Sequence, residues 1–495
     1  MSERCDVSAV IHPALGRRSS LWYETLWSLP IRTFWGCFAG VLGLMTWNAF
    51  WRLGDTFVRD YDEGRYGVAA SEMLHRHSTL VTTYAGATEF WNLKPPVGYW
   101  LLELSYRLVG ETPFALRLPA AVCALATTAL TMLLARDVAG RRAAIVAGVL
   151  LATSFGFLAH HGARSGELDA PLTLLLFLLL MLAPRLFDSR AARLAAGLVL
   201  ALGFLVKSFA ILPYVAAIGV YCLLTRGISS WRVWVLPVCI ASAIGATWAV
   251  ARCVAEGSSE FVRRMFVEDL LLRSTTAIDP VRASAWDYVG ALFDRLAPWP
   301  LIVVVACCLS GRFAKRRLTE GFSVLLWCYC LIPLVLFTLA RTHHSHYIIP
   351  LYPAWAILGA VATLEVLQVV RRTRWAVSAA WVLVICVLAC EGRLIAHMEI
   401  HDRLPPAQIF LASLRERIEP GTPLYTTFTP SYSERFFLQV VDGLVLSEAQ
   451  RDGHSLSNGL VLVKKSAVGQ GAGDCLSEAV VLSQHEDYVL ARIPR

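Results

Sequence analysis

Two neighbouring carboxylates follow the first long apolar segment of the chain. Asp62 and Glu63 stand in the stretch Arg59-Asp60-Tyr61-Asp62-Glu63-Gly64-Arg65-Tyr66. A carboxylate can take a proton from an attacking group, bind a cation or remain a solvated surface charge. Lys94 precedes two prolines about thirty residues later, before the next long apolar segment. We interpret this stretch as a candidate catalytic loop, which other elements must hold in place.

The rest of the chain consists mainly of apolar segments. It has 495 residues, of which 56% are hydrophobic, and its mean hydropathy is +0.54, above the range of soluble domains. Core helices of a soluble protein would keep polar faces, so we exclude that class. About eleven segments are long enough, or nearly so, to cross a membrane: residues 33–51, 118–135, 143–163, 170–184, 194–206, 208–225, 233–251, 296–311, 321–340, 347–364 and 375–390.

Positive charge alternates between the loops that join these segments. By the positive-inside rule, the basic loops face the cytoplasm. This topology accounts for the basic residues without nucleic acid, and it requires that residues 95–110, with Glu103 and Arg107, form an interfacial helix and not a span. The basic residues are Arg17, Arg18, Arg136, Arg141, Arg142, Arg185, Arg190, Arg193, Arg226, Arg232, Arg312, Lys315, Arg316, Arg317, Arg371, Arg372 and Arg374.

The predicted fold is an α-helical polytopic membrane protein with a small C-terminal α/β domain. Residues 1–32 form a cytoplasmic tail, and residues 33–393 form the transmembrane domain with outer loops 52–117 and 252–295. Residues 394–495 lack a long apolar run, so we expect them in water outside the membrane. The pattern predicts helices over residues 68–77 and 405–418 and strands over residues 423–428, 459–463, 479–482 and 488–493.

The span count places most polar outliers on the outer side. Ionisable side chains at membrane depth are costly and usually functional. Lys207 is the clearest case, because it interrupts an otherwise apolar segment. Carboxylates together with several cations suit a phosphate-bearing substrate. These outer residues are Arg65, Lys94, Arg164, Glu167, Asp169, Lys207, Glu268, His343, His344, His346 and Tyr347.

Two classes of protein fit these features. The first is an enzyme that uses a lipid-linked donor at the outer face. The second is a polytopic transporter or flippase of lipid-linked glycans, which would show helices broken by Gly and Pro at the midplane in two matching halves. No half-to-half repeat is visible, and the charges cluster at the outer ends of the spans. The sequence therefore favours the enzyme.

Five motifs, in order over about residues 30–365, resemble the GT-C superfamily of membrane glycosyltransferases, and more narrowly the branch of protein O-mannosyltransferases and lipid A aminoarabinose transferases. Each motif is weak alone, but the order and the sidedness agree. The motifs are Asp60-Tyr61-Asp62-Glu63-Gly64-Arg65-Tyr66, Trp91-Asn92-Leu93-Lys94-Pro95-Pro96-Val97-Gly98-Tyr99-Trp100, Arg164-Ser165-Gly166-Glu167-Leu168-Asp169, Leu202-Gly203-Phe204-Leu205-Val206-Lys207 and Tyr347-Ile348-Ile349-Pro350.

The resemblance implies an inverting transfer of a hexose or pentose from a polyprenyl-phosphate donor to a lipid, glycan or protein on the outer face of the inner (plasma) membrane. It implies Asp62 as the catalytic carboxylate, with Glu63 beside it. Arg65, Lys94 and Lys207 would bind the donor phosphate. The residues that would bind the acceptor or orient the reacting groups are Asp169, Arg164, Glu268 and Tyr347.

Departures from the family pattern leave the sugar and the acceptor open. Leu93 stands where the aminoarabinose transferases typically carry an acid, and histidines precede Tyr347 where Lys-Leu-Pro is common. The close histidines His343, His344 and His346 could bind a metal. We interpret them instead as interfacial side chains, and we expect neither a metal nor another cofactor.

Overall fold

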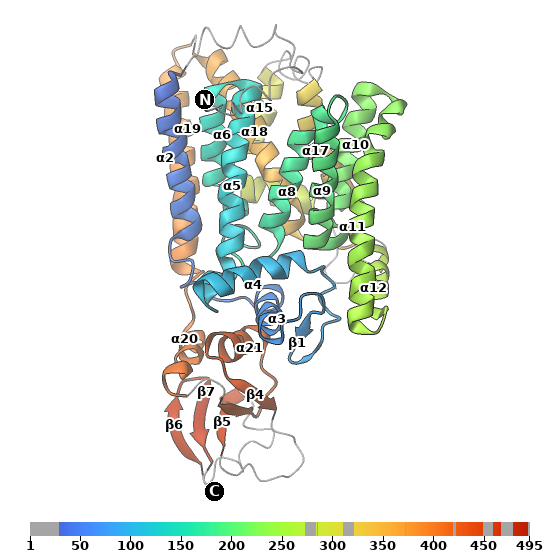
Figure 1. Cartoon of the computed structure of the whole chain (residues 1–495). Helices are drawn as coiled ribbons and strands as arrows, with labels where there is room; N and C mark the ends of the chain where they lie inside the picture. The colour runs from blue at the N-terminus through green and yellow to red at the C-terminus, as the bar shows by residue number, and fades with distance from the viewer. Residues whose placement is uncertain are drawn as a thin grey trace, which may run out of the picture.

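The computed structural model describes residues 29–272, 284, 286–309, 321–371, 373–418, 422–448, 459–466 and 479–493. It shows a bundle of long helices with a small sheet-containing domain at one end (Figure 1). Residues 1–28 of the predicted tail, the whole basic cluster at 312–317 and Arg372 lie outside the described residues.

The bundle follows the apolar segments closely. Each expected span overlaps a helix, because an apolar segment in lipid must satisfy its backbone hydrogen bonds internally. The helices are α2 (Ile31–Phe50), α5 (Pro113–Ala139), α6 (Arg141–Ala152), α8 (Asp169–Leu182), α9 (Arg190–Lys207), α10 (Leu212–Arg226), α11 (Arg232–Glu256), α15 (Trp299–Leu309), α17 (Gly321–Leu339), α18 (Tyr352–Val370) and α19 (Ala376–Ile400).

Seven helical stretches in the described residues are long and apolar enough to cross a membrane, or eight if α14 (Asp287–Leu296) and α15, bent by 103°, form one span. The chain is therefore a polytopic membrane protein. The count falls below eleven partly because residues 190–226, expected as two spans, form one helical stretch by this measure. In addition, α6 has 12 residues and the described part of α15 has 11.

The first loop forms a layer of its own beneath the bundle. Helix α4 (Val97–Val109) lies across the lower ends of the bundle helices (Figure 1), as expected for the interfacial segment at 95–110. Helix α3 (Asp62–Arg76) lies below α4 and begins six residues before the helix predicted at 68–77. The hairpin of β1 (Thr83–Tyr84) and β2 (Ala87–Thr88) packs against α3.

The C-terminal domain contains a five-stranded mixed sheet in the order β4-β3-β5-β7-β6. Strands β3 (Pro423–Thr426), β5 (Leu460–Lys464), β6 (Val480–Gln484) and β7 (Tyr488–Arg492) match the four predicted strands. Strand β4 (Val445–Glu448), which pairs parallel to β3, was not predicted. Helix α20 (Pro406–Ala412) and the turn η7 (Leu414–Glu416) replace the single helix predicted at 405–418.

This domain packs directly on α3. Helix α21 (Tyr432–Arg435) and η8 (Phe436–Val441) contact α3, and the Ser433 amide donates to the Asp60 carboxylate at 2.8 Å. One cluster of buried apolar side chains continues from Phe34 in α2 to Leu490 in β7. The first loop is thus held between the bundle and the C-terminal domain.

Gly64 permits a close approach of two backbone segments across this junction. A Cβ atom there would lie 2.8 Å from the backbone carbon of Tyr432, closer than real contacts allow. We expect Gly64→Ala to loosen the C-terminal domain, although alanine usually stabilises a helix by about 1 kcal/mol relative to glycine. Thermal unfolding in detergent and protease release of residues 394–495 would measure the effect.

Gly290→Ala is the matched control. Gly290 also lies inside a helix, α14, but a Cβ atom there meets nothing within 4 Å. This variant should be as stable as the parent or slightly more stable. Equal protease resistance of the two variants would show that the close approach at Gly64 does not hold the domain.

Candidate active site

Asp62 is the first residue of α3, at the positive end of the helix dipole. Its carboxylate is half-buried and, among the residues that the structure describes, has no hydrogen-bond or ion-pair partner. Among its polar neighbours are His161 and Glu167, whose ligand-type atoms lie within 4.8 Å of its own and of each other. Asp62 is therefore placed to accept a proton or a cation.

Glu63 points elsewhere, into a buried ion pair with Arg117 of α5. Arg117 Nε donates to Glu63 Oε1 at 2.7 Å, and both side chains are 1% exposed. The amides of Arg59 and Gly166 donate to the same carboxylate at 3.0 and 2.8 Å. Burial opposes ionisation of Glu63, but the charge and hydrogen bonds of Arg117 outweigh it and lower the pKa of the carboxyl. Glu63 is held as a structural anion beside Asp62.

Asp169 and Lys207 meet where α8 begins and α9 ends. Lys207 Nζ donates to Asp169 Oδ2 at 2.6 Å, and both side chains are largely buried. The acid stands at a helix N-terminus and the base at a C-terminus, so each also complements a helix dipole. The structure thus joins a predicted phosphate-binding residue to a predicted orienting residue.

Lys94 forms a second pair of the same kind with Asp269. Its Nζ donates to the two Asp269 oxygens at 2.9 and 2.6 Å, and Ser208, the residue after Lys207, donates to Asp269 at 3.0 Å. Asp269 therefore links Lys94 to Ser208, the residue that follows Lys207. The first outer loop, the end of α9 and η5 (Met265–Leu272) meet at this point.

Arg65 is enclosed by the first loop and the C-terminal domain. Its guanidinium donates to Glu89 at 2.7 and 2.8 Å, and its charge lies over the rings of Tyr84, Trp91 and Tyr432 at 4.5, 4.7 and 4.9 Å. Glu89 in turn accepts from the amide of Trp91 at 2.6 Å. Arg65 thereby stabilises the turn that leads to Lys94.

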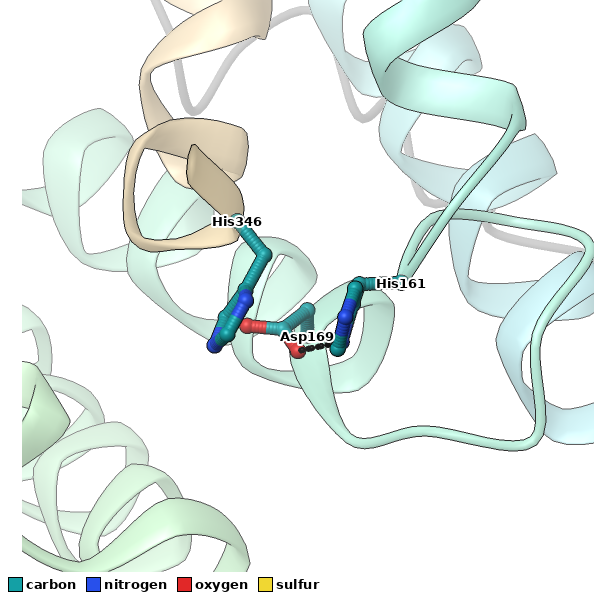
Figure 2. A group of neighbouring side chains, drawn as sticks. All are labelled: His161, Asp169 and His346. Atoms are coloured by element: carbon teal, nitrogen blue, oxygen red, sulfur yellow. Dashed lines mark ion pairs between the residues drawn. The ribbon is translucent and has the colours of Figure 1, made fainter. Parts of the chain in front are cut away.

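The second half of the bundle contributes His346 and Tyr347 from η6 (Ser345–Leu351). The ring of His346 stacks on that of His161, with centroids 4.1 Å apart. Figure 2 shows Asp169 between these two histidines, with its ion pair to His161 marked. The Tyr347 carbonyl accepts a hydrogen bond from the Tyr214 hydroxyl at 2.6 Å, which ties η6 to α10.

Two predicted site residues are engaged differently. Arg164 is buried and donates to the carbonyls of Asn48 and Trp51 at 3.0 and 2.8 Å, so it caps the C-terminal end of α2. Burial lowers the pKa of Arg164 to about 10. Glu268 is half-buried in η5, and it is the adjacent Asp269 that accepts a hydrogen bond from Lys94. Successive helical residues point in different directions, which separates these two acids.

The structure adds neighbours that the sequence interpretation did not place in the site: His161, Glu167, Asp269 and Arg295. His161 contacts the Glu167 carboxylate directly and lies 4.0 Å from Asp169. Burial, followed by the charge of Lys207 and Arg59, lowers the pKa of His161 well below its usual range, so the imidazole is neutral at pH 7. Glu167 was noted only as an outer charge, and no signal in the sequence distinguished His161.

Arg295 lies at the edge of the same group, on α14. Its Nη1 atom is buried, and no hydrogen-bond partner for it lies in the described part of the chain. Its charge contributes to the lowered pKa values of His160 and His161, so it is near the histidines. Burial is the main cause of the shift for His160, whose pKa falls to about 4.

Three residues in this region have strained backbones. Tyr61, His161 and Ser208 have φ values of 67°, 60° and 53°, where residues other than glycine are uncommon. Tyr61 directly precedes Asp62, His161 is one of the two stacked histidines, and Ser208 directly follows Lys207. Such conformations cost about 1–3 kcal/mol each and persist where the surroundings hold them, often at functional sites.

Replacement of Glu63 distinguishes a structural from a catalytic carboxylate. Glu63→Gln leaves the Arg117 charge buried without its anion, which should cost about 3–5 kcal/mol of unfolding free energy. Asp62→Asn removes no described partner, so its stability should match the parent. Thermal unfolding of both variants in detergent measures the difference. Parental stability of Glu63→Gln with loss of activity would instead support the catalytic role implied by the sequence.

The sequence of the chain is similar to those of known proteins. Residues 93–251 match the family model described as dolichyl-phosphate-mannose-protein mannosyltransferase. The chain is 30% identical over 317 residues to an undecaprenyl phosphate-alpha-4-amino-4-deoxy-L-arabinose arabinosyl transferase of Pseudomonas savastanoi pv. phaseolicola, covering 61% of this chain and 57% of the relative. A relative with the same name from Serratia proteamaculans is 28% identical over 346 residues, covering 66% and 60%. The matches thus span less than two thirds of these relatives.

Solved structures extend the likeness to nearly the whole chain. ArnT from Cupriavidus metallidurans bound to undecaprenyl phosphate matches with a TM-score of 0.72 at 18% identity, covering 94% of this chain and 98% of that one. An oligosaccharyltransferase from Archaeoglobus fulgidus matches with a TM-score of 0.52 at 11% identity, covering 90% and 70%. At these identities the likeness concerns the fold, and the fold includes the C-terminal region.

Proposed function

From this fold and these relatives we infer that the chain is a GT-C membrane glycosyltransferase that takes a sugar from a polyprenyl-phosphate donor. The observation that carries the inference is the convergence of Asp62, Asp169, Lys94 and Lys207 at the loop-side ends of the bundle helices. These residues come from four separate parts of the sequence. A site at the edge of the bundle can be reached by a lipid whose phosphate lies at the membrane surface.

The donor phosphate would bind near Lys94 and Lys207. The carbon–oxygen bond from the sugar to this phosphate breaks during transfer, and the polyprenyl phosphate leaves with the bonding electrons. Ammonium groups stabilise the charge that grows on the phosphate oxygen. Both lysines are preorganised by carboxylates, Asp269 and Asp169, so their positions do not depend on the donor.

Asp62 would act on the acceptor. The acceptor oxygen attacks the sugar carbon from the face opposite the phosphate, which inverts its configuration. A hydroxyl acceptor would give its proton to Asp62, whereas a phosphate acceptor is already anionic and needs only to be oriented. Asp169, held by Lys207, lies beside the histidines and would orient the reacting groups.

The relatives direct the choice of substrates. Both carry undecaprenyl phosphate-linked 4-amino-4-deoxy-L-arabinose in their names, so we propose this pentose donor first, with a lipid of the lipid A type as acceptor. A free hydroxyl or phosphate on an envelope glycan or protein is the second acceptor class. The proposed location is the inner membrane, with the site and the C-terminal domain facing away from the cytoplasm.

A flippase would carry the same lipid without changing it. The arrangement favours transfer, because the charged residues lie at helix ends beside an interfacial helix and a folded outer domain. A transporter would place them at the midplane, between two repeats. Only a transferase forms a new conjugate between the sugar and the acceptor.

Purified protein in lipid vesicles, supplied with the donor and lipid A, tests the proposal by mass spectrometry of the products. Asp62→Asn should lower kcat about 10²–10⁴-fold for a hydroxyl acceptor, since it removes the general base. Lys94→Met and Lys207→Met should chiefly raise KM for the donor, about tenfold or more. Each variant must insert into membranes at the parental level.

Asp487→Asn is the control. This exposed side chain directly precedes β7 in the C-terminal domain and lies 3.8 Å from His485, so its replacement should leave the kinetics unchanged. Undiminished transfer by Asp62→Asn and Lys207→Met would remove the assigned roles. Movement of the intact donor across the vesicle without any conjugate would favour the flippase.

A further inference from the structure

The group formed by His161, Asp169 and His346 has the composition of a metal site. Each residue offers one ligand atom, and these atoms lie within 4.8 Å of one another (Figure 2). Two imidazole nitrogens and one carboxylate oxygen form a common ligand set for catalytic zinc, which leaves a fourth position open. Ligand atoms around one tetrahedral zinc lie about 3.4 Å apart, so small side-chain rotations would close the site.

The arrangement of the two histidines suits this use. A metal binds a neutral imidazole, because the coordinating nitrogen must offer a lone pair. The stacked ring of His346 lies 4.1 Å away, a spacing that disfavours positive charge on both rings.

The neighbouring charges also call for a cation. Asp62, Glu167, Asp169 and Asp269 bring four carboxylates to the region, against the ammonium groups of Lys94 and Lys207. Arg295 adds a positive charge, and Arg59 is paired with Asp402 at 3.5 Å. The sum remains negative.

That balance is unfavourable for a phosphate, which needs a positive environment. Lys207 occupies Oδ2 of Asp169 at 2.6 Å, but the carboxylate has a second oxygen. A divalent cation beside Asp169 would make the group positive and leave both lysine pairs intact. The same ion would keep a coordination position for a phosphate oxygen.

We propose that His161, Asp169 and His346 bind a divalent transition-metal ion of the zinc type, with Glu167 as a further carboxylate beside the ion, because it contacts the same Nδ1 atom of His161 that faces Asp169. This replaces the expectation from sequence, which considered His343, His344 and His346 and favoured interfacial side chains. The structure places only His343 apart, where it pairs with Asp287 at 2.9 Å. The ring of His344 stacks on that of His346, and His346 faces His161. Metal binding does not depend on the proposed transfer reaction.

The test uses full-length protein with no polyhistidine tag, treated with a chelator and then titrated with Co²⁺. We expect one Co²⁺ per chain, a visible absorption band from the bound ion, and its displacement by Zn²⁺ but not by Mg²⁺, since imidazole ligands select against magnesium. His161→Ala and His346→Ala should each weaken binding at least tenfold. His346→Gln serves as a second variant if the alanine protein does not fold.

His343→Ala is the matched control, because it removes a histidine from the same loop but outside the group. It should retain the Co²⁺ band and the parental affinity. Absence of saturable Co²⁺ binding to the parent, or equal binding by the parent and His346→Gln, would overturn the metal site. Binding that is intact while no donor is consumed would overturn the proposed transfer reaction and leave the metal site standing.

Discussion

The buried ion pair between Glu63 and Arg117 is the constraint on which the site depends. Arg117 donates to Glu63 and to the carbonyls of Leu53, Thr56 and Phe57, while Glu63 also accepts from Gly166. Two charges with these partners tie the loop after α2, the start of α5 and the loop before α8 into one unit. Loss of either charge leaves the other buried without a counter-ion, which strongly destabilises the fold. Asp62, one residue away, takes its direction from that unit.

The same rule of paired charges organises the rest of the site. Three cations of the site are each held by a carboxylate: Lys207 by Asp169, Lys94 by Asp269 and Arg65 by Glu89. Pairing fixes the positions of the lysines but reduces the net positive charge available to a phosphate. Preorganisation and charge are thus in conflict, and an additional cation resolves that conflict without freeing either lysine.

The sequence predicted the helices and the convergence of the site better than the pairing of side chains. Long apolar runs can satisfy their backbone only as helices, so their positions followed directly. By contrast, Asp62 and Glu63, or Glu268 and Asp269, are adjacent acids that sequence alone cannot orient. Arg164 was assigned to the site, yet it caps α2 through carbonyls more than 110 residues away. Strand β4 is short and was missed because its pairing with β3 is a long-range property.

The C-terminal domain also supports the site, although its sequence contains no motif that indicates a function. Tyr432 lies over the Arg65 guanidinium, and Ser433 binds Asp60, so the domain closes the outer side of the first loop. Arg65 and Glu89 then hold the turn that carries Lys94. The stretch between α3 and Lys94 has only two short strands of its own, which cannot keep a lysine at a defined position in water. The bundle fixes one side of that loop through Glu63, and the domain fixes the other, which explains why a domain remote in sequence is needed for a site formed by the bundle.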